Sequence, residues 1–202
     1  MELNEALSQI SEIRRQMARG EVFRGYRSAT TAFSGCVAVS VCVIQWHWPP
    51  QSLNLYLEVW LAAASVSLAV VATEMIIRCY KSESSLQREM TQIAVEQFVP
   101  CLVAGGLLTY VMLHYAWTSF WMMPGLWALL FAMGIFSSRR VLPKGTGAVG
   151  AWYLLSGLVC IVIQSSQPAV LPFPWEMALC FGVGQFLAAF VLYWNLERRH
   201  GE

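Results

Sequence analysis

Residues Leu55–Ile77 read LYLEVWLAAASVSLAVVATEMII, and Arg78 follows directly. This stretch contains two charged residues, Glu58 near its start and Glu74 near its end, with none between them. A helix rises about 1.5 Å per residue, so about 20 residues cross a hydrocarbon core of about 30 Å. The stretch therefore predicts a transmembrane helix.

Five further segments share this composition: Ala29–Gln45, Ile93–Tyr115, Phe120–Phe136, Ala148–Ile163 and Met177–Leu196. Hydrophobic residues make up 57% of the chain and charged residues 12%, about half the charged fraction of a typical soluble domain. Backbone groups inside a bilayer have no water to bond, so such spans must be helical. The sequence predicts an all-α membrane protein with six transmembrane helices in a lipid bilayer.

The basic residues indicate how these helices are oriented. All 13 Lys and Arg lie before the first segment, after the last, or in the second-to-third and fourth-to-fifth connections. The three other connections contain none and are flanked by Trp and Tyr residues. Cytoplasmic connections are enriched in Lys and Arg, and Trp and Tyr gather at membrane interfaces. We expect a cytoplasmic amphipathic segment at 1–27, a six-helix transmembrane domain at 28–197 and a cytoplasmic tail at 198–202.

The N-terminal segment carries an apolar stripe of Leu3, Ala6, Ile10, Ile13 and Met17. Alternating spacings of three and four residues place these side chains on one face of a helix. Glutamates are interspersed with arginines on the polar side, whereas an anionic membrane surface would favour a purely basic face. We therefore interpret the stripe as a docking surface for a protein, with the membrane surface as the alternative.

Glu74 and Glu96 lie near the cytoplasmic ends of consecutive antiparallel helices, at the inner boundary of the hydrocarbon. Arg78 follows Glu74 by four residues, which places the acid and the base on one helix face. We interpret these residues as an interfacial charge network that fixes helix positions. The alternative is a proton or cation site that uses the two glutamates, with Gln97 beside Glu96, because ionisable residues at membrane depth are often functional.

Three other polar residues, Gln185, Glu58 and Glu176, lie away from the inner boundary of the hydrocarbon. Gln185 lies close to the bilayer midplane, and a buried amide usually forms interhelical hydrogen bonds. We expect that role for Gln185, with contact to a substrate as the alternative. Glu58 and Glu176 fall near the outer boundary, where we expect both to be solvated.

His47 and His114 end the first and third segments on the outer side, and Met112 lies at a similar depth. Imidazole and thioether ligands suit copper, and two histidines on neighbouring helices can also bind haem. The spacing of these residues matches no regular motif. We interpret the histidines as part of the interfacial aromatic belt, with a metal site as the alternative, and expect no cofactor.

No motif for catalysis is present. The sequence contains no aspartate, no Gly-x-Ser-x-Gly and no His-x-x-x-His. Its six cysteines lie within or beside the apolar segments without a CxxC pair, which is typical of small buried hydrophobes. A net charge of +1 without a basic patch argues against a nucleic-acid partner. We therefore expect a protein that is not an enzyme.

The run from Asn4 to Tyr26 and the closing run FGVGQF at Phe181–Phe186, continued to Glu197, resemble bacterial six-span inner-membrane proteins of no assigned function. The resemblance implies a multi-pass location in a bacterial inner membrane and supplies no site residues. We expect a membrane anchor, sensor or regulatory subunit that binds a cytoplasmic partner through residues 1–27. The alternative is a transporter or channel for a small solute, cation or metal. Either protein could be a homo-oligomer.

Overall fold

The computed structural model describes residues 28–81, 85–140, 142–143, 145–166 and 171–197. Within these ranges the chain is all-helical, and six helical segments are long and apolar enough to cross a membrane. The prediction of six helices with the length and composition of membrane spans is therefore confirmed. The predicted amphipathic segment, with Leu3, Ile10, Ile13 and Met17, and the predicted tail lie outside the described residues.

The first three spans are single helices: α2 (Ser28–His47), α3 (Leu53–Lys81) and α4 (Ser85–Tyr115). The fourth begins as the 3-10 helix η1 (Trp117–Met122) and continues through α5 (Met123–Ser137) into η2 (Ser138–Arg140). The fifth is α6 (Thr146–Ser166). The sixth span comprises α7 (Pro174–Met177), the π-helix η3 (Ala178–Val183), α8 (Gly184–Leu192) and the π-helix η4 (Tyr193–Glu197).

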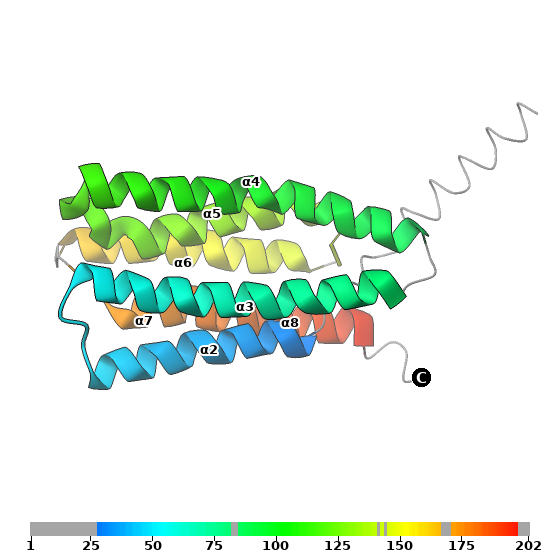
Figure 1. The fold of residues 1–202 in the computed structure, drawn as a ribbon, viewed down its shortest axis with the longest axis horizontal. Coiled ribbons are helices and arrows are strands. Elements are labelled where there is room, and N and C mark those ends of the chain that lie inside the picture. Colours follow the sequence, from blue (N-terminus) through cyan, green and yellow to red (C-terminus); the bar gives the residue numbers. More distant parts are fainter. Residues whose placement is uncertain (1–27, 82–84, 141, 144, 167–170, 198–202) are drawn as a thin grey trace, which may run out of the picture.

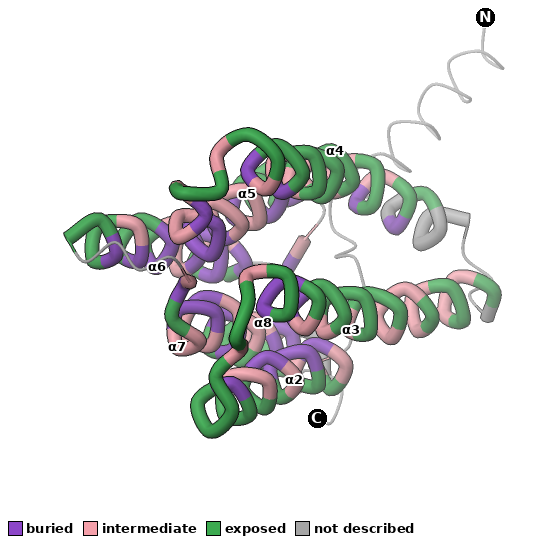
Figure 2. Tube along the Cα trace, turned by 60° about the vertical axis from the view of Figure 1, so that its left-hand side comes forward, coloured by how far each residue is buried: buried purple, intermediate pink, exposed green. Residues whose placement is uncertain are grey.

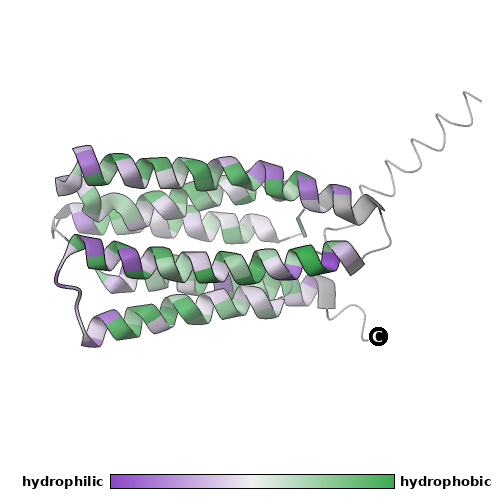
Figure 3. Ribbon diagram, viewed as in Figure 1, coloured by the Kyte–Doolittle hydropathy of each residue, from purple (hydrophilic) through white to green (hydrophobic). Residues whose placement is uncertain are grey.

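Successive spans run in opposite directions, so their ends gather at the two ends of one elongated bundle (Figure 1). The end that holds the α2–α3, α4–η1 and α6–α7 connections is called the aromatic end. The opposite end, with the α3–α4 and η2–α6 connections, is called the basic end. Figure 3 shows apolar residues along the middle of the helices and more polar residues toward both ends. This pattern is that of a multi-pass membrane protein.

The helices form two groups (Figures 1 and 2). In one group, α2 packs along α8 and η3 and also against α3. In the other, α4 packs on α5, and α5 packs along α6. The sixth span contacts α6 as well as α2, so it joins the two groups. The first and last spans of the chain are therefore neighbours.

Glycines allow α5 and α6 to approach closely. A Cβ atom added at Gly125 would lie 2.6 Å from the carbonyl oxygen of Gly157, and one added at Gly157 would lie 2.8 Å from that of Gly125. Gly184 makes a similar approach, because an added Cβ atom would lie 2.5 Å from the Tyr153 ring on α6. Small residues of this kind are common where membrane helices cross.

Buried residues lie where the helices face one another (Figure 2), and they include two apolar clusters. The cluster at the aromatic end joins α2 and α3 to η1, α5 and α7, and it includes Tyr56, Trp60, Phe120, Met123 and Met177. The second joins α5 and α6 to η3, and it includes Ala128, Tyr153, Cys160 and Cys180. On their other faces α3 and α4 turn large apolar side chains outward, among them Leu68 and Leu107. A bilayer is the environment that suits such faces.

Candidate functional site

Glu176 lies in the first turn of the sixth span, at the aromatic end. Phe173 is extended, and Pro174 occupies the first turn, where its fixed φ and missing N–H favour a helix start. Glu176 is 0% exposed. The expectation that Glu176 is solvated is therefore wrong, because α2 packs against α7 at this level. Glu58, at the same end of the bundle, is exposed.

α2 and α3 contribute an amide and two aromatic rings to the same region. Trp60 Nε1 donates a hydrogen bond to Gln45 Oε1 over 2.9 Å. Tyr56 lies one turn before Trp60, with ring centres 6.3 Å apart. Tyr56 shares a buried cluster with Met177, the neighbour of Glu176, and its hydroxyl lies within electrostatic range of the Glu176 carboxyl. These contacts bring α2, α3 and the sixth span together.

Several buried polar atoms at the aromatic end of the bundle have no hydrogen-bond partner among the described residues. They are both carboxyl oxygens of Glu176, the Tyr56 hydroxyl, Nε2 of Gln45 and both amide atoms of Gln164. Gln164 is 1% exposed and follows Cys160 by four residues, on the face of α6 that meets the sixth span. We call Glu176, Tyr56, Trp60, Gln45 and Gln164 the Glu176 cluster.

The chemistry of the Glu176 cluster follows from its lack of a counter-charge. Burying an isolated carboxylate without a partner is far more costly than burying a neutral polar group. Among the described residues, Lys and Arg occur at the basic end of the bundle, away from Glu176. Glu176 therefore needs a proton or a bound cation to become neutral. The oxygens of Tyr56 and Gln164 are ligands of the type that hard cations prefer.

Two buried thiols lie beside the Glu176 cluster. The Sγ atoms of Cys160 on α6 and Cys180 on η3 are 3.6 Å apart. Cys180 follows Glu176 by four residues, and both thiols lie within electrostatic range of the Glu176 carboxyl. Ser156, one turn before Cys160 on α6, donates its hydroxyl to the carbonyl oxygen of Tyr153 over 3.4 Å. We call Cys160 and Cys180 the thiol pair.

At the basic end, Glu74 and Arg78 form the predicted ion pair along one face of α3. Arg78 Nε donates to Glu74 Oε1 over 3.2 Å, and the two side chains are 38% and 20% exposed, respectively. The pair lines an open cleft of about 650 Å³ together with Thr30, Ala69, Val70, Thr73 and Ile77. The acid and the base therefore satisfy each other within one helix.

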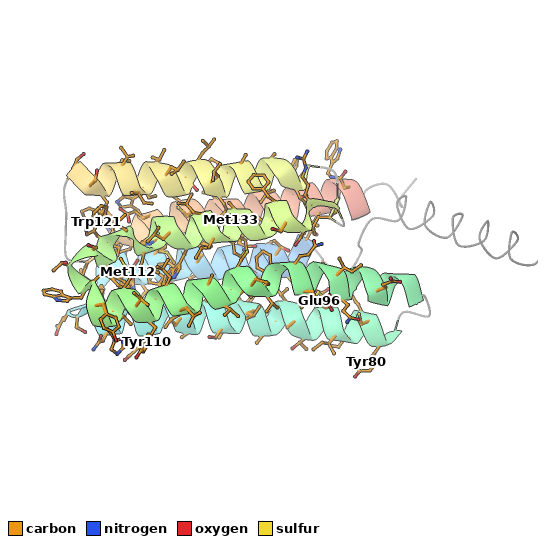
Figure 4. The ribbon with its side chains drawn as sticks, turned by 90° about the horizontal axis from the view of Figure 1, so that it is seen from above. Tyr80, Glu96, Tyr110, Met112, Trp121 and Met133 are labelled. Carbon is orange, nitrogen blue, oxygen red and sulfur yellow. The ribbon has the colours of Figure 1, made fainter. Side chains whose placement is uncertain are left out.

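Glu96 is exposed on α4 (Figure 4) and accepts a hydrogen bond from Gln92 Nε2 over 2.9 Å. Glu74 and Glu96 thus each have a partner on their own helix. Gln97 is half-buried, and its Oε1 has no partner among the described residues. Gln185 is half-buried with its Cβ against Gly35, so it packs between the sixth span and α2.

The predicted outer histidines are both exposed at the aromatic end. His114 Nδ1 lies 2.9 Å from the carbonyl oxygen of Tyr110 on the same helix. Met112 is buried, whereas Tyr110 lies on the outside of α4 (Figure 4). His47 ends α2 and His114 lies near the end of α4, helices of different groups. In the part of the chain that the structure describes, no three His, Cys, Asp or Glu side chains gather as metal ligands would.

The depth of Glu176 along its span did not predict its burial. The spacing of the residues that follow it does indicate that Glu176 lies on a helix-packing face. Glu176, Cys180 and Gly184 recur every four residues, and a helix start at Pro174 places them on one face. Small residues at that spacing are typical of the face that packs on other helices. The thiol pair had no comparable signal, because sequence separation does not show which helices are neighbours.

Comparisons with models of protein families, with curated proteins and with solved structures found no match. The chemistry of the Glu176 cluster is thus the basis on which a function is inferred.

Proposed function

We propose that this chain is a multi-pass membrane transporter that binds a proton or a monovalent metal cation at Glu176. The observation that carries the proposal is the complete burial of Glu176 without a hydrogen-bond partner among the described residues. Ionisable groups inside membrane domains are costly and are typical of ion pathways and proton relays. A proton or a cation bound by Glu176 would remove this cost.

The origin of the surrounding side chains supports the same function. Gln45 comes from α2, Tyr56 from α3 and Gln164 from α6, while Glu176 belongs to the sixth span. A site built between spans changes its geometry when the spans move against one another, as transporters require. The sixth span also joins the two groups of helices, so such a movement would act on Glu176 directly.

In the proposed transporter, Glu176 is the ion site in place of Glu74 and Glu96. Glu74 is paired with Arg78, and Glu96 is exposed with a partner on its own helix. Both observations favour a structural role for these two glutamates. Glu176 is the buried acid that lacks such a partner among the described residues.

Cation binding is tested on the purified full-length protein in lipid nanodiscs. A protonated Glu176 should give a carboxyl band in the infrared spectrum that disappears in Glu176→Gln. A bound metal cation should instead give thermal stabilisation by Na⁺ or K⁺ relative to choline, worth about 2.7 kcal/mol at a hundredfold excess over Kd. This stabilisation should also disappear in Glu176→Gln.

Glu58→Gln is the matched control, because Glu58 is an exposed glutamate at the same end of the bundle. The change should leave both the infrared band and the cation effect unaltered. If wild-type protein shows neither a Glu176-dependent band nor a Glu176-dependent cation effect, the binding proposal is wrong.

Transport is tested separately in proteoliposomes with an imposed membrane potential. Wild-type protein should move protons or Na⁺ across the bilayer, and Glu176→Gln should abolish the movement while Glu58→Gln preserves it. A protein that binds a cation at Glu176 yet moves neither ion would be a cation-binding membrane protein and not a transporter.

Sidedness follows from the basic residues. Because Lys and Arg are confined to segments that adjoin one end of the bundle, we infer that this end faces the cytoplasm, together with both termini. The resemblance of Asn4–Tyr26 and Phe181–Glu197 to bacterial inner-membrane proteins supports that membrane as the location. Glu176 would then lie near the extracytoplasmic side.

Residues 1–27 support a second function, which is the binding of a cytoplasmic protein or of another copy of the chain. Leu3, Ile10, Ile13 and Met17 form an apolar stripe that needs a surface to cover it, since burial of each side chain is worth about 1.5–3 kcal/mol. Deletion of residues 1–20 should abolish co-purification of the partner or change the oligomeric state, and Ile10→Asp with Ile13→Asp should do the same. Unchanged partners and oligomeric state would contradict this function.

A further inference from the structure

The thiol pair has a geometry that suits more than packing. Cys160 and Cys180 are 1% and 0% exposed, and their Sγ atoms are already in contact at 3.6 Å. A disulfide bond is about 2.05 Å long, so the sulfurs need to approach by about 1.5 Å. Adjustment of the two side chains on packed, neighbouring helices can supply a movement of that size.

The backbone beside Cys180 is suited to such an adjustment. Cys180 lies within η3, where the helix is wound as a π-helix. π-Helical turns are rare and frequently occur at functional sites. Gly182 and Gly184 follow Cys180 closely, so this part of the sixth span carries little side-chain bulk.

The thiol pair adjoins the Glu176 cluster, because Cys180 lies one turn after Glu176 and both thiols lie within electrostatic range of the Glu176 carboxyl.

We propose that Cys160 and Cys180 form a peroxide-reactive dithiol, in which a hydroperoxide oxidises the pair to a disulfide between α6 and the sixth span. Cys180 is the attacking residue, because it lies in the π-helical segment η3, whose backbone can adjust. Cys160 is the resolving residue, because its Sγ is already 3.6 Å from that of Cys180. The reaction goes beyond cation binding and does not depend on it.

The oxidation of the thiol pair proceeds in two steps. The Cys180 sulfur attacks one peroxide oxygen, and its thiol proton passes to the other. The O–O bond breaks, an S–O bond forms, and the departing oxygen leaves with that proton as an alcohol or water. The Cys160 sulfur then attacks the Cys180 sulfenic acid, an S–S bond replaces the S–O bond, and water leaves with the Cys160 proton. In total, two thiols and an organic hydroperoxide yield a disulfide, an alcohol and one water. With hydrogen peroxide, the products are a disulfide and two waters.

The disulfide would link α6 covalently to the sixth span beside the Glu176 cluster. Cys160 and Cys180 are 20 residues apart in sequence, and the α6–α7 connection lies between them. A bond between them would prevent α6 and the sixth span from moving apart at this level. The chemical class of the oxidant is a small hydroperoxide.

The test treats purified full-length protein in nanodiscs with hydrogen peroxide. The protein is then denatured, its remaining thiols are alkylated, and the labels are counted by mass spectrometry. Of the six cysteines, wild type should lose two labels and keep four (6 − 2 = 4), and a peptide pair joined through residues 160 and 180 should appear. Cys36→Ser and Cys101→Ser are matched controls that should still form this bond.

Two variants examine the individual roles. Cys160→Ser should leave Cys180 as a sulfenic acid that dimedone traps, and Cys160→Ala serves if the serine variant does not fold. Cys180→Ser should yield no joined peptide and no sulfenic acid at residue 180.

Two results would overturn the proposal. One is a wild-type pair that stays fully alkylatable at peroxide concentrations that oxidise Cys36. The other is oxidation of Cys160 and Cys180 without the joined peptide. Because thiol counts do not report cation binding, these results are distinguishable from failure of the cation site.

Discussion

Trp60 on α3 donates its indole N–H to Gln45 Oε1 on α2 over 2.9 Å, within the buried aromatic end of the bundle. This bond joins two consecutive spans at the level of Glu176 and fixes the amide of Gln45 in one orientation. The Nε2 of the same amide is left without a partner among the described residues. The Trp60–Gln45 bond is therefore a structural support of the Glu176 cluster.

Trp60→Phe should lower the free energy of unfolding by about 1–2 kcal/mol, because it removes the bond and leaves Gln45 Oε1 buried without its donor. The measurement is a denaturation curve of the purified protein in mild detergent. Trp48→Phe is the control, since Trp48 is 74% exposed, and it should have little effect. Equal stability of the two variants would contradict the role assigned to the Trp60–Gln45 bond.

Gly125→Ala should destabilise the protein by about 1–3 kcal/mol, because overpacking forces helices apart. The added Cβ atom would lie 2.6 Å from the carbonyl oxygen of Gly157, so the backbones of α5 and α6 must separate. Gly106→Ala on α4 is the control, because nothing lies within 4 Å of a Cβ atom added there. It should be neutral or slightly stabilising, since alanine favours helices over glycine. Thermal unfolding of both variants measures the difference.

Glu74→Gln should lower the free energy of unfolding by less than about 1 kcal/mol, since partly exposed ion pairs contribute little. The difference from wild type should shrink at high salt, which screens the charge of Arg78. The same denaturation curves, recorded at two salt concentrations, give the result. A loss of ion flux in Glu74→Gln, with flux retained in Glu176→Gln, would reverse the assignment of the ion site.

Reporter fusions test the sidedness of the bundle. Fusions after Pro50 and Thr118 should report an extracytoplasmic location, because the connections at the aromatic end contain no Lys or Arg. A fusion after Gly145, in a connection with basic residues, should report the cytoplasm. A cytoplasmic signal from either of the first two would mean that the orientation is wrong.

Much of the fold could be predicted from the sequence, because hydrocarbon thickness dictates span length and every span was marked by an apolar run. The ends of the helices were predicted less accurately. The predicted segment Leu55–Ile77 corresponds to a helix that extends to Lys81, because the backbone continues to form helical hydrogen bonds after the side chains become polar. The arrangement of the spans was not predictable, since lipid-facing and protein-facing residues are both apolar.

In the candidate site, contacts within one helix could be predicted from the sequence, whereas contacts between helices could not. The Glu74–Arg78 pair depends on a spacing of four residues within one helix, so the sequence revealed it. The Glu176 cluster depends on which helices meet, and its members are far apart in the chain. Depth along a span gave the level of Glu176, while its rotation about the helix axis decided its burial.

The adjacency of α2 and the sixth span has a consequence for biosynthesis. The ribosome synthesises α2 before the sixth span. The contacts between α2 and the sixth span can therefore form only after the helices between them have been made. During that interval Gln45 can bond to Trp60 as soon as α3 is inserted, but the surface that later contacts Glu176 faces lipid. A chain interrupted before Pro174 would leave this face of α2 without the sixth span that covers it. Exposed surfaces of incompletely assembled chains are prone to misassembly, so insertion of the sixth span completes the packing of α2.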